Sequence, residues 1–157
     1  MKSTKSSEYE SLVNLLMSDL CGATLGTSVR GGGSNLISGA SGHNHQIDVS
    51  IHSPSELVLI ECKHVCKNLQ PHHVLTHAAR LLDIRAAHPN LSVSASVVSI
   101  KSGSIGAKRI ADYFGLEMDL ALSLEDYCVT IKERHHVGAV VRAHATDSAD
   151  AEIRRSG

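Results

Sequence analysis

The sequence predicts a single domain of the α/β (α+β) class, in which helices flank a mixed central sheet. The chain of 157 residues is long enough to bury a hydrophobic core without disulfide or metal cross-links. Hydrophobic residues make up 42% of it and charged residues 20%, which is typical of a globular chain. Strand-like and helix-like hydrophobic patterns alternate along the sequence, and this alternation favours helices packed on a sheet.

The first half of the chain is expected to contain one helix and two strands. Residues 7–20 place leucines near helical spacing, and Gly22 follows as a helix-ending residue. Residues 26–42 are rich in glycine and serine, which indicates loops and turns. Residues 46–51 alternate between apolar and polar side chains and predict a half-buried strand. The largely apolar residues 56–62 predict a second strand, close enough to pair with the first as an antiparallel hairpin.

The second half is expected to alternate helix and strand twice. Residues 72–87 predict a helix, followed by a strand over residues 91–100. The apolar stripe of this helix consists of Val74, Leu75, Ala78, Leu81, Leu82 and Ile84. Residues 106–114 predict a short helix that ends at Gly115, and residues 116–122 a last short strand.

Composition excludes several classes of protein. No apolar run approaches the roughly 20 residues that span a bilayer, and the polar N-terminal stretch does not resemble a signal peptide. The four cysteines lack the paired spacing of a zinc site. We therefore expect a cytoplasmic protein with reduced thiols and no membrane association. The formal net charge of −1 does not by itself indicate a nucleic-acid-binding protein.

The clearest chemical pattern consists of Asp48 and the triplet Glu61-Cys62-Lys63. Glu61 and Lys63 are two residues apart on one expected strand, so their side chains project from the same face. Pairing with the preceding strand brings Asp48 to the same end of the hairpin. Two carboxylates and the backbone carbonyl of Cys62 form an all-oxygen site suited to Mg²⁺, for which Mn²⁺ can substitute. A metal and a lysine in this arrangement are what phosphodiester hydrolysis requires.

Together the two segments resemble the core motif of the PD-(D/E)xK nucleases, the restriction-endonuclease-like superfamily. The matching residues are 46–49 (QIDV) and 57–63 (LVLIECK). Ile47 stands where the pattern of the superfamily usually has a proline, a change that many members tolerate. The resemblance implies a restriction-endonuclease-like sheet and hydrolysis of phosphodiester bonds.

Weaker similarities extend the resemblance to the Mrr-type restriction endonucleases. Residues 9–16 resemble the first helix of those enzymes, and residues 106–111 and 114–116 resemble a late helix and the short strand after it. The resemblance makes residues 1–128 the catalytic domain. Residues 129–157 are then a C-terminal extension, expected to supply an edge strand or a dimer contact and to end in a loosely ordered tail. Mrr-type enzymes also tend to carry a separate DNA-recognition domain, for which this chain leaves no room.

The resemblance implies a metal-dependent DNA endonuclease and assigns roles to individual residues. Asp48 and Glu61 hold the metal, and Lys63 is the catalytic cation. In this superfamily a glutamate of the first helix often joins the site; Glu10 is expected there, with Glu8 as the alternative. A homodimer is expected, because one small domain covers one DNA strand. A Holliday-junction or other structure-specific resolvase, and a catalytically silent nucleic-acid-binding module with the same fold, are the alternatives.

The histidines and basic residues offer further candidates. His73 and His77 are four residues apart on an expected helix, a spacing that can hold a transition metal, although no HExxH pattern accompanies them. His43 and His45 lie just before the aspartate of the motif and are candidates for contact with a phosphate or the attacking water. Basic side chains in the middle of the chain give it a modest basic excess and a surface suited to phosphate contact.

Overall fold

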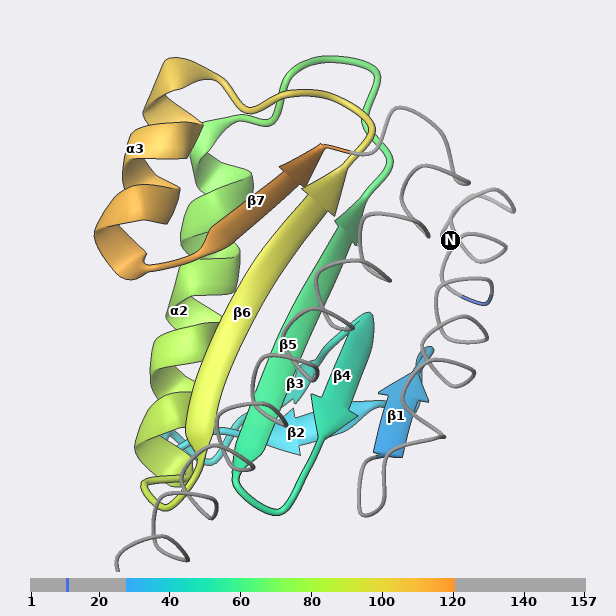
Figure 1. Ribbon diagram of the computed structural model, residues 1–157, viewed down its shortest axis with the longest axis vertical. Coiled ribbons are helices and arrows are strands. Elements are labelled where there is room, and N and C mark those ends of the chain that lie inside the picture. Colours follow the sequence, from blue (N-terminus) through green and yellow to red (C-terminus); the bar gives the residue numbers. More distant parts are fainter. Residues whose placement is uncertain (1–10, 12–27, 121–157) are drawn as a thin grey trace, which may run out of the picture.

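The computed structural model describes residue 11 and residues 28–120. The expected first helix lies outside these residues except for residue 11, so Glu8 and Glu10 cannot be placed relative to the site. The extension over residues 129–157 also lies outside them. The other residues of the predicted site fall within the part of the chain that is drawn in colour in Figure 1.

A five-stranded mixed sheet forms the centre of the described fold, with the strand order β1-β4-β5-β6-β7. Its strands are β1 (Ser28–Gly31), β4 (Val49–His52), β5 (Glu56–Lys63), β6 (Ser92–Ser99) and β7 (Glu117–Leu120). The pairs β1–β4 and β4–β5 are antiparallel, whereas β5–β6 and β6–β7 are parallel. The expected hairpin of the two motif strands and the expected mixed sheet are therefore confirmed.

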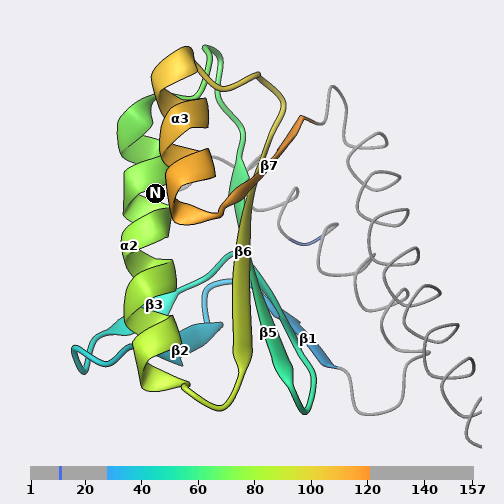
Figure 2. The ribbon, with the colours of Figure 1, turned by 60° about the vertical axis from the view of Figure 1, so that its left-hand side comes forward.

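Two helices cover one face of this sheet, as Figure 2 shows. Helix α2 (Pro71–Ala87) connects β5 to β6, and α3 (Ile105–Phe114) connects β6 to β7. Parallel neighbours need such a crossover, because the chain must return to the starting edge before the next strand begins. Neither helix is long and apolar enough to cross a membrane.

The helix ends follow from local sequence. Pro71 occupies the first turn of α2, where its missing N–H costs nothing, and the backbone N–H of Gln70 donates to Nδ1 of His73 at 3.1 Å. Ser104 caps α3 by accepting the N–H of Ala107. Gly115 ends α3 with φ at 65°, a left-handed conformation that glycine adopts without strain.

The glycine-rich segment forms strands rather than only loops, which corrects the sequence prediction for residues 26–42. It contains β1 as well as β2 (Leu36–Ser38), which pairs with β3 (Asn44–Gln46) in a separate two-stranded sheet. The strand expected over residues 46–51 is divided between β3 and β4, which belong to different sheets. The change of partner falls between Ile47 and Asp48. The N–H of Ile47 donates to the carbonyl of Asn35 at 3.0 Å, in register with the β2–β3 pair. The carbonyl of Asp48 accepts the N–H of Gly32 at 3.3 Å, in register with the β1–β4 pair.

The β2–β3 hairpin is fastened to α2 through Asp83. Its carboxylate accepts the N–H of Ser41 at 2.8 Å and the hydroxyl of Ser41 at 2.6 Å, and it contacts Nε2 of His45 at 2.7 Å. Hydrogen bonds from Ser41 and His45 hold the pKa of Asp83 well below its usual value, at about 2. A Cβ atom at Gly39 would lie 1.9 Å from the same carboxylate, so only glycine permits this close approach.

The hydrophobic core lies between the helices and the sheet. From α2 it receives Val74, Ala78, Leu81 and Ile84, and from β5 it receives Leu57 and Leu59. Two leucines expected in the α2 stripe, Leu75 and Leu82, are instead 45% and 47% exposed. Their place toward the sheet is taken by His77, which is fully buried.

Strand β4 is buried on both faces, although a half-buried strand was expected. Ser50 is 0% exposed and Asp48, just before the strand, is 7% exposed. Both project toward the side of the sheet that α2 and the hairpin cover, because Ser50 bonds to Asn35 and stands opposite Leu59 in the ladder. The polar residues of the alternating pattern therefore line an interior site instead of a solvated surface.

Candidate functional site

The end of the β4–β5 ladder brings two carboxylates together. Val49 pairs with Ile60, so Asp48 and Glu61 stand opposite each other one step beyond the ladder. Residues opposite each other in antiparallel strands share a face of the sheet. Asp48 is 7% exposed and Glu61 5% exposed, and buried carboxylates require charged or hydrogen-bonding partners.

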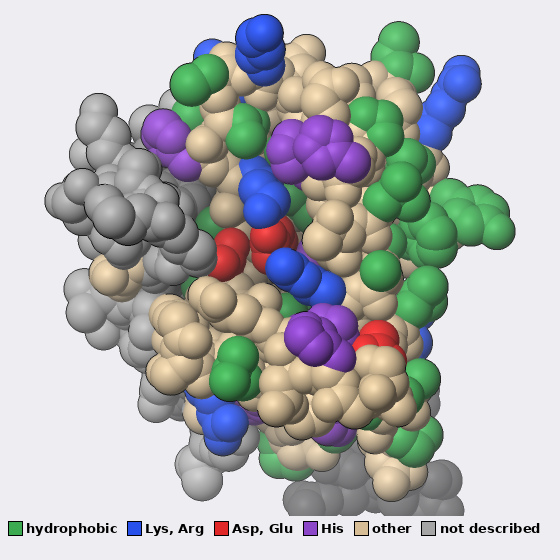
Figure 3. All heavy atoms as spheres, turned by 180° about the vertical axis from the view of Figure 1, so that it is seen from behind, with side chains coloured by type: hydrophobic (Ala, Val, Ile, Leu, Met, Phe, Trp, Pro, Cys, Tyr) green, Lys and Arg blue, Asp and Glu red, His purple; other side chains and the backbone are tan. Residues whose placement is uncertain are grey.

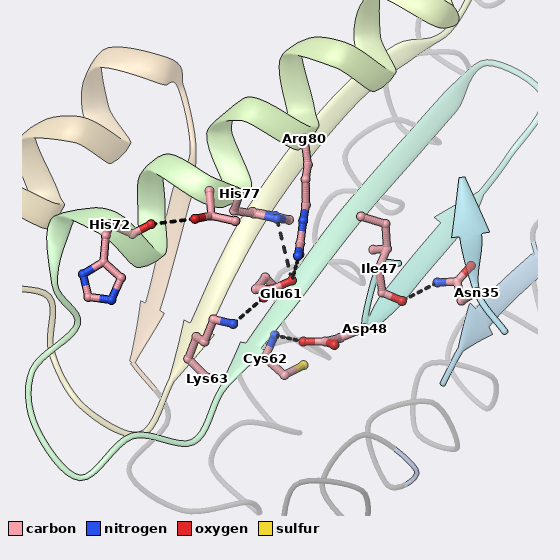
Figure 4. Close-up of polar contacts among 10 residues, drawn as sticks. Asn35, Ile47, Asp48, Glu61, Cys62, Lys63, His72, His77 and Arg80 are labelled. Carbon is pink, nitrogen blue, oxygen red and sulfur yellow. Dashed lines mark hydrogen bonds and ion pairs between the residues drawn. The ribbon is translucent and has the colours of Figure 1, made fainter. Parts of the chain in front are cut away.

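Asp48 is held by the backbone of the neighbouring strand. The N–H of Cys62 donates to Oδ2 of Asp48 at 2.9 Å, a contact that Figure 4 shows. In a β-strand the N–H and C=O groups of one residue point toward the same edge. The carbonyl of Cys62 therefore also points toward the β4 side, where Asp48 lies.

Glu61 is bound by two basic side chains that come from different elements. Lys63, on the same face of β5, donates from Nζ to Oε1. Arg80, on α2, donates from Nη1 to Oε2 at 2.8 Å. Figure 4 shows both cations directed at this one carboxylate. The sequence motif predicted that Lys63 lies beside Glu61, but it gave no reason to single out Arg80.

The pKa of Glu61 depends on two opposing effects, burial and the neighbouring positive charges. Burial alone would raise it, but the positive charge of Lys63 and its hydrogen bond, followed by the charge of Arg80, outweigh burial and lower the pKa below its usual value. The carboxylate is therefore ionised at neutral pH despite being buried. An ionised buried carboxylate is the form that can bind a cation.

His77 lies behind the carboxylate, one helical turn before Arg80. Its Nδ1 is 3.9 Å from Oε2 of Glu61. Among the described residues neither ring nitrogen has a partner in full hydrogen-bond geometry, although the backbone of Leu59 lies near enough to favour the protonated ring. Burial lowers the pKa of His77 to about 4, although the Glu61 carboxylate acts in the opposite direction. The imidazole is thus uncharged at neutral pH.

This burial predicts a pH-dependent stability. Between its folded pKa of about 4 and the ordinary value of 6.5, His77 is protonated only in the unfolded chain, so acid favours unfolding. We expect the free energy of unfolding to fall by roughly 2 kcal/mol from about pH 7 to about pH 5 on this account. Glu61 acts in the same direction, but only below its usual pKa near 4.5.

Urea unfolding across this pH range measures the effect. The His77→Leu variant should show a flatter dependence of the unfolding free energy on pH, whereas replacement of the exposed His43 by alanine should not change the slope. A slope in His77→Leu equal to that of the wild type would contradict the assignment to this residue.

Asn35 fixes the backbone from which Asp48 projects. Its side-chain Nδ2 donates to the carbonyl of Ile47 at 2.9 Å and to that of Arg30 at 3.3 Å. Its Oδ1 accepts the hydroxyl of Ser50 at 3.1 Å. Asn35 is 5% exposed, so these contacts are shielded from water. Sequence reasoning missed it, because a polar residue in a glycine-rich segment resembles an ordinary turn residue.

The Asn35→Ala variant should lose about 2–4 kcal/mol of stability, because it leaves several buried polar groups without their partner. Replacement of Asn44, an exposed residue that accepts one hydrogen bond from Ser38, should cost no more than about 1 kcal/mol. Urea unfolding of the two variants compares them directly. Equal losses would show that the Asn35 contacts contribute no more than a surface hydrogen bond.

The donor set fits a hard divalent cation. Among the described residues no three His, Cys, Asp or Glu side chains come together as a metal-binding group. Mg²⁺ does not require such a group, because it is commonly held by one or two carboxylates while water and substrate phosphates complete its shell. Asp48, Glu61 and the Cys62 carbonyl provide oxygen ligands of that kind.

The other histidine candidates do not meet at this site. His45 is bound to Asp83 at the hairpin, so it is directed to α2. His73 accepts a hydrogen bond at the start of α2, and His77 faces Glu61 from the interior. The two helix residues therefore do not form the transition-metal pair that their spacing allows.

Acidic, basic and histidine side chains gather on one face of the molecule. In Figure 3 acidic side chains lie near the centre of the face, with lysine or arginine side chains immediately on both sides and histidines further out. The side chains of Lys63 and Arg80 are each 28% exposed, against 7% for Glu61. An anionic ligand approaching this face therefore meets the cations before it reaches the buried carboxylate.

The sequence matches no protein-family model, and a comparison with curated proteins also gives no match. Its fold matches solved structures. VC1899 from Vibrio cholerae superposes with a TM-score of 0.56 at 17% identity, over 79% of this chain and 32% of that protein. AF1548, a protein of unknown function, gives 0.53 at 19% identity, over 70% and 56%. EndoMS in complex with double-stranded DNA gives 0.50 at 17% identity, over 74% and 44%.

At these identities the similarity establishes the fold alone. The matched part of this chain spans between about a third and just over half of those proteins. The mixed five-stranded sheet with its two crossover helices has the restriction-endonuclease-like α/β fold expected from the sequence. The narrower resemblance to Mrr-type enzymes is not established by these matches.

Proposed function

We propose that this chain is a metal-dependent DNA endonuclease that hydrolyses phosphodiester bonds. The observation that carries the proposal is the meeting of Asp48, Glu61 and Lys63 at the end of the β4–β5 ladder, on a nuclease-like fold. Buried ionised carboxylates and a neighbouring lysine are costly for folding, so their convergence favours a chemical role.

In this proposal Mg²⁺, or Mn²⁺ in its place, is held by Asp48, Glu61 and the Cys62 carbonyl. Such a cation, when bound, offsets the charge of a phosphate and acidifies a water molecule. Asp48 is kept in position by the Cys62 N–H and by the Asn35 contacts to the adjoining backbone. Lys63 orients the attacking water and stabilises the negative charge that develops on the phosphate.

DNA as the substrate is supported by the fold match to EndoMS, whose structure contains double-stranded DNA. The partly exposed side chains of Lys63 and Arg80, which both contact Glu61, provide phosphate contacts beside the carboxylates. A homodimer, in which each copy acts on one strand, remains part of the proposal. So does the Mrr-type relationship, which rests on the motifs in residues 9–16 and 106–116.

Incubation of the full chain with supercoiled plasmid tests the proposal. We expect nicking or linearisation with Mg²⁺ or Mn²⁺ and none with EDTA. A linear duplex and a four-way junction of matched sequence should be tested in parallel, since a strong preference for the junction would indicate a structure-specific resolvase. If no DNA is cut and no Mn²⁺ is bound, the catalytically silent binding module is the better account.

A further inference from the structure

The buried carboxylate at the centre of the site is fully engaged by cations from the protein itself. Lys63 contacts one oxygen of Glu61, and Arg80 contacts the other at 2.8 Å. These are the same oxygens that are proposed to hold a divalent cation. Each oxygen keeps a second acceptor site, but a divalent cation bound there would lie beside a protein cation. The positive charge of Lys63 or Arg80 therefore opposes metal binding at Glu61.

Arg80 is the contact that can yield without disturbing the fold. Its helix is anchored by the buried residues Val74, Ala78 and Leu81, so only the long side chain needs to move. That side chain is 28% exposed. A guanidinium has five N–H donors in a planar fork, which matches the oxygens of a phosphate.

Charge balance indicates what the released side chain would bind. Asp48 and Glu61 supply two negative charges, and Lys63 and Arg80 supply two positive charges. A divalent cation would leave this group with two excess positive charges. A phosphodiester removes one of them, and the dianionic transition state of its hydrolysis removes both.

We propose that Arg80 is a substrate-contact residue that exchanges partners: it pairs with Glu61 when no divalent cation is bound, and it binds a phosphate oxygen of the nucleic acid when one is. This inference rests on the proposed function and adds to it a residue from outside the sequence motif. The pairing with Glu61 keeps a basic side chain in place beside the carboxylates until the cation and the substrate replace it.

Calorimetric titration with Mn²⁺, without DNA, tests the first half of the exchange. Arg80→Gln should bind Mn²⁺ at least about fivefold more tightly than the wild type, because a competing positive charge is removed. Arg109→Gln, an equal charge change at an exposed position of α3, should leave the affinity unchanged. If Arg80 only holds Glu61 in place, its replacement should weaken Mn²⁺ binding or leave it unchanged, and either result would overturn the inference.

Fluorescence anisotropy with a short labelled linear duplex tests the second half. With Ca²⁺, a divalent cation used here to measure binding without cleavage, Arg80→Gln should lower DNA affinity and reduce the slope of log affinity against log salt by about one. In EDTA its slope should equal that of the wild type, because Arg80 is then held by Glu61. Any effect of Arg109→Gln should be the same in both conditions. Equal slopes for wild type and Arg80→Gln in Ca²⁺ would exclude a phosphate contact.

Two further comparisons keep the outcomes distinct. A wild-type protein that binds no Mn²⁺ would reject the proposed function and this inference together. A wild type that binds Mn²⁺ and nicks plasmid, combined with no gain in Mn²⁺ affinity for Arg80→Gln, would overturn only the inference. Arg80→Lys serves if Arg80→Gln does not fold: it should keep the wild-type salt slope in Ca²⁺ but bind the duplex more weakly, because lysine lacks the bidentate fork. Wild-type affinity in that variant would also count against the exchange.

Discussion

Replacement of Lys63 by alanine is expected to abolish detectable cleavage of plasmid DNA, a loss of at least about 100-fold. The lysine is the only basic side chain of the motif, and its Nζ lies directly on the Glu61 carboxylate. The fold should be preserved, because Arg80 still neutralises Glu61 from α2. Plasmid nicking in Mg²⁺, with circular dichroism and urea unfolding of the same preparation, measures both properties.

The neighbouring Lys67 supplies the control for this experiment. It is exposed and only four residues further along the chain, so Lys67→Ala removes the same charge without touching Glu61. We expect this variant to cleave nearly as well as the wild type. Cleavage by Lys63→Ala at the wild-type rate would show that the lysine of the motif has no part in the reaction.

Replacement of Asp48 by asparagine is expected to remove metal binding while keeping the local structure. Asparagine can still accept the N–H of Cys62, the contact that Asp48 makes at 2.9 Å. The substitution removes one negative charge. The attraction between that charge and a unit positive charge at roughly 4 Å is about 4 kcal/mol at the effective dielectric constant near a protein surface. Mn²⁺ affinity should therefore fall at least about 100-fold, and cleavage should fall with it.

Calorimetry with Mn²⁺ in the absence of DNA reads this effect without depending on activity. Asp112→Asn removes the same charge from an exposed position on α3 and should bind Mn²⁺ like the wild type. If Asp48→Asn also binds like the wild type, Asp48 is not a ligand and the metal site must be sought elsewhere.

The local pattern predicted most of the elements that bear the site. The apolar run before Glu61 predicted β5, and the helical spacing of apolar residues after it predicted α2. Both predictions use only the local periodicity of hydrophobic side chains. The same periods placed Lys63 beside Glu61, two residues away on one face. The roles of these residues in binding a metal remain predictions.

The sequence-based predictions were wrong where contacts between distant segments of the chain determine the structure. Residues 28–31 became β1 only because β4 offers a partner edge, and the separation of β3 from β4 depends on Asn35 bonding to Ile47. On α2, the stripe read from the sequence included Leu75 and Leu82, whereas the packed face contains His77. A periodic pattern fixes which residues share a face, but the neighbouring sheet decides which face is buried.

The sequence by itself therefore determined the α/β class, the β4–β5 pairing and the Asp48, Glu61 and Lys63 set, because these follow from short-range periodicity and turn length. Only the tertiary structure added Asn35, His77 and Arg80 to that set. Asn35 is 13 residues before Asp48 in the chain, and Arg80 is 19 residues after Glu61. No local pattern links them, since packing of α2 and the hairpin against the sheet is what brings their side chains to the carboxylates.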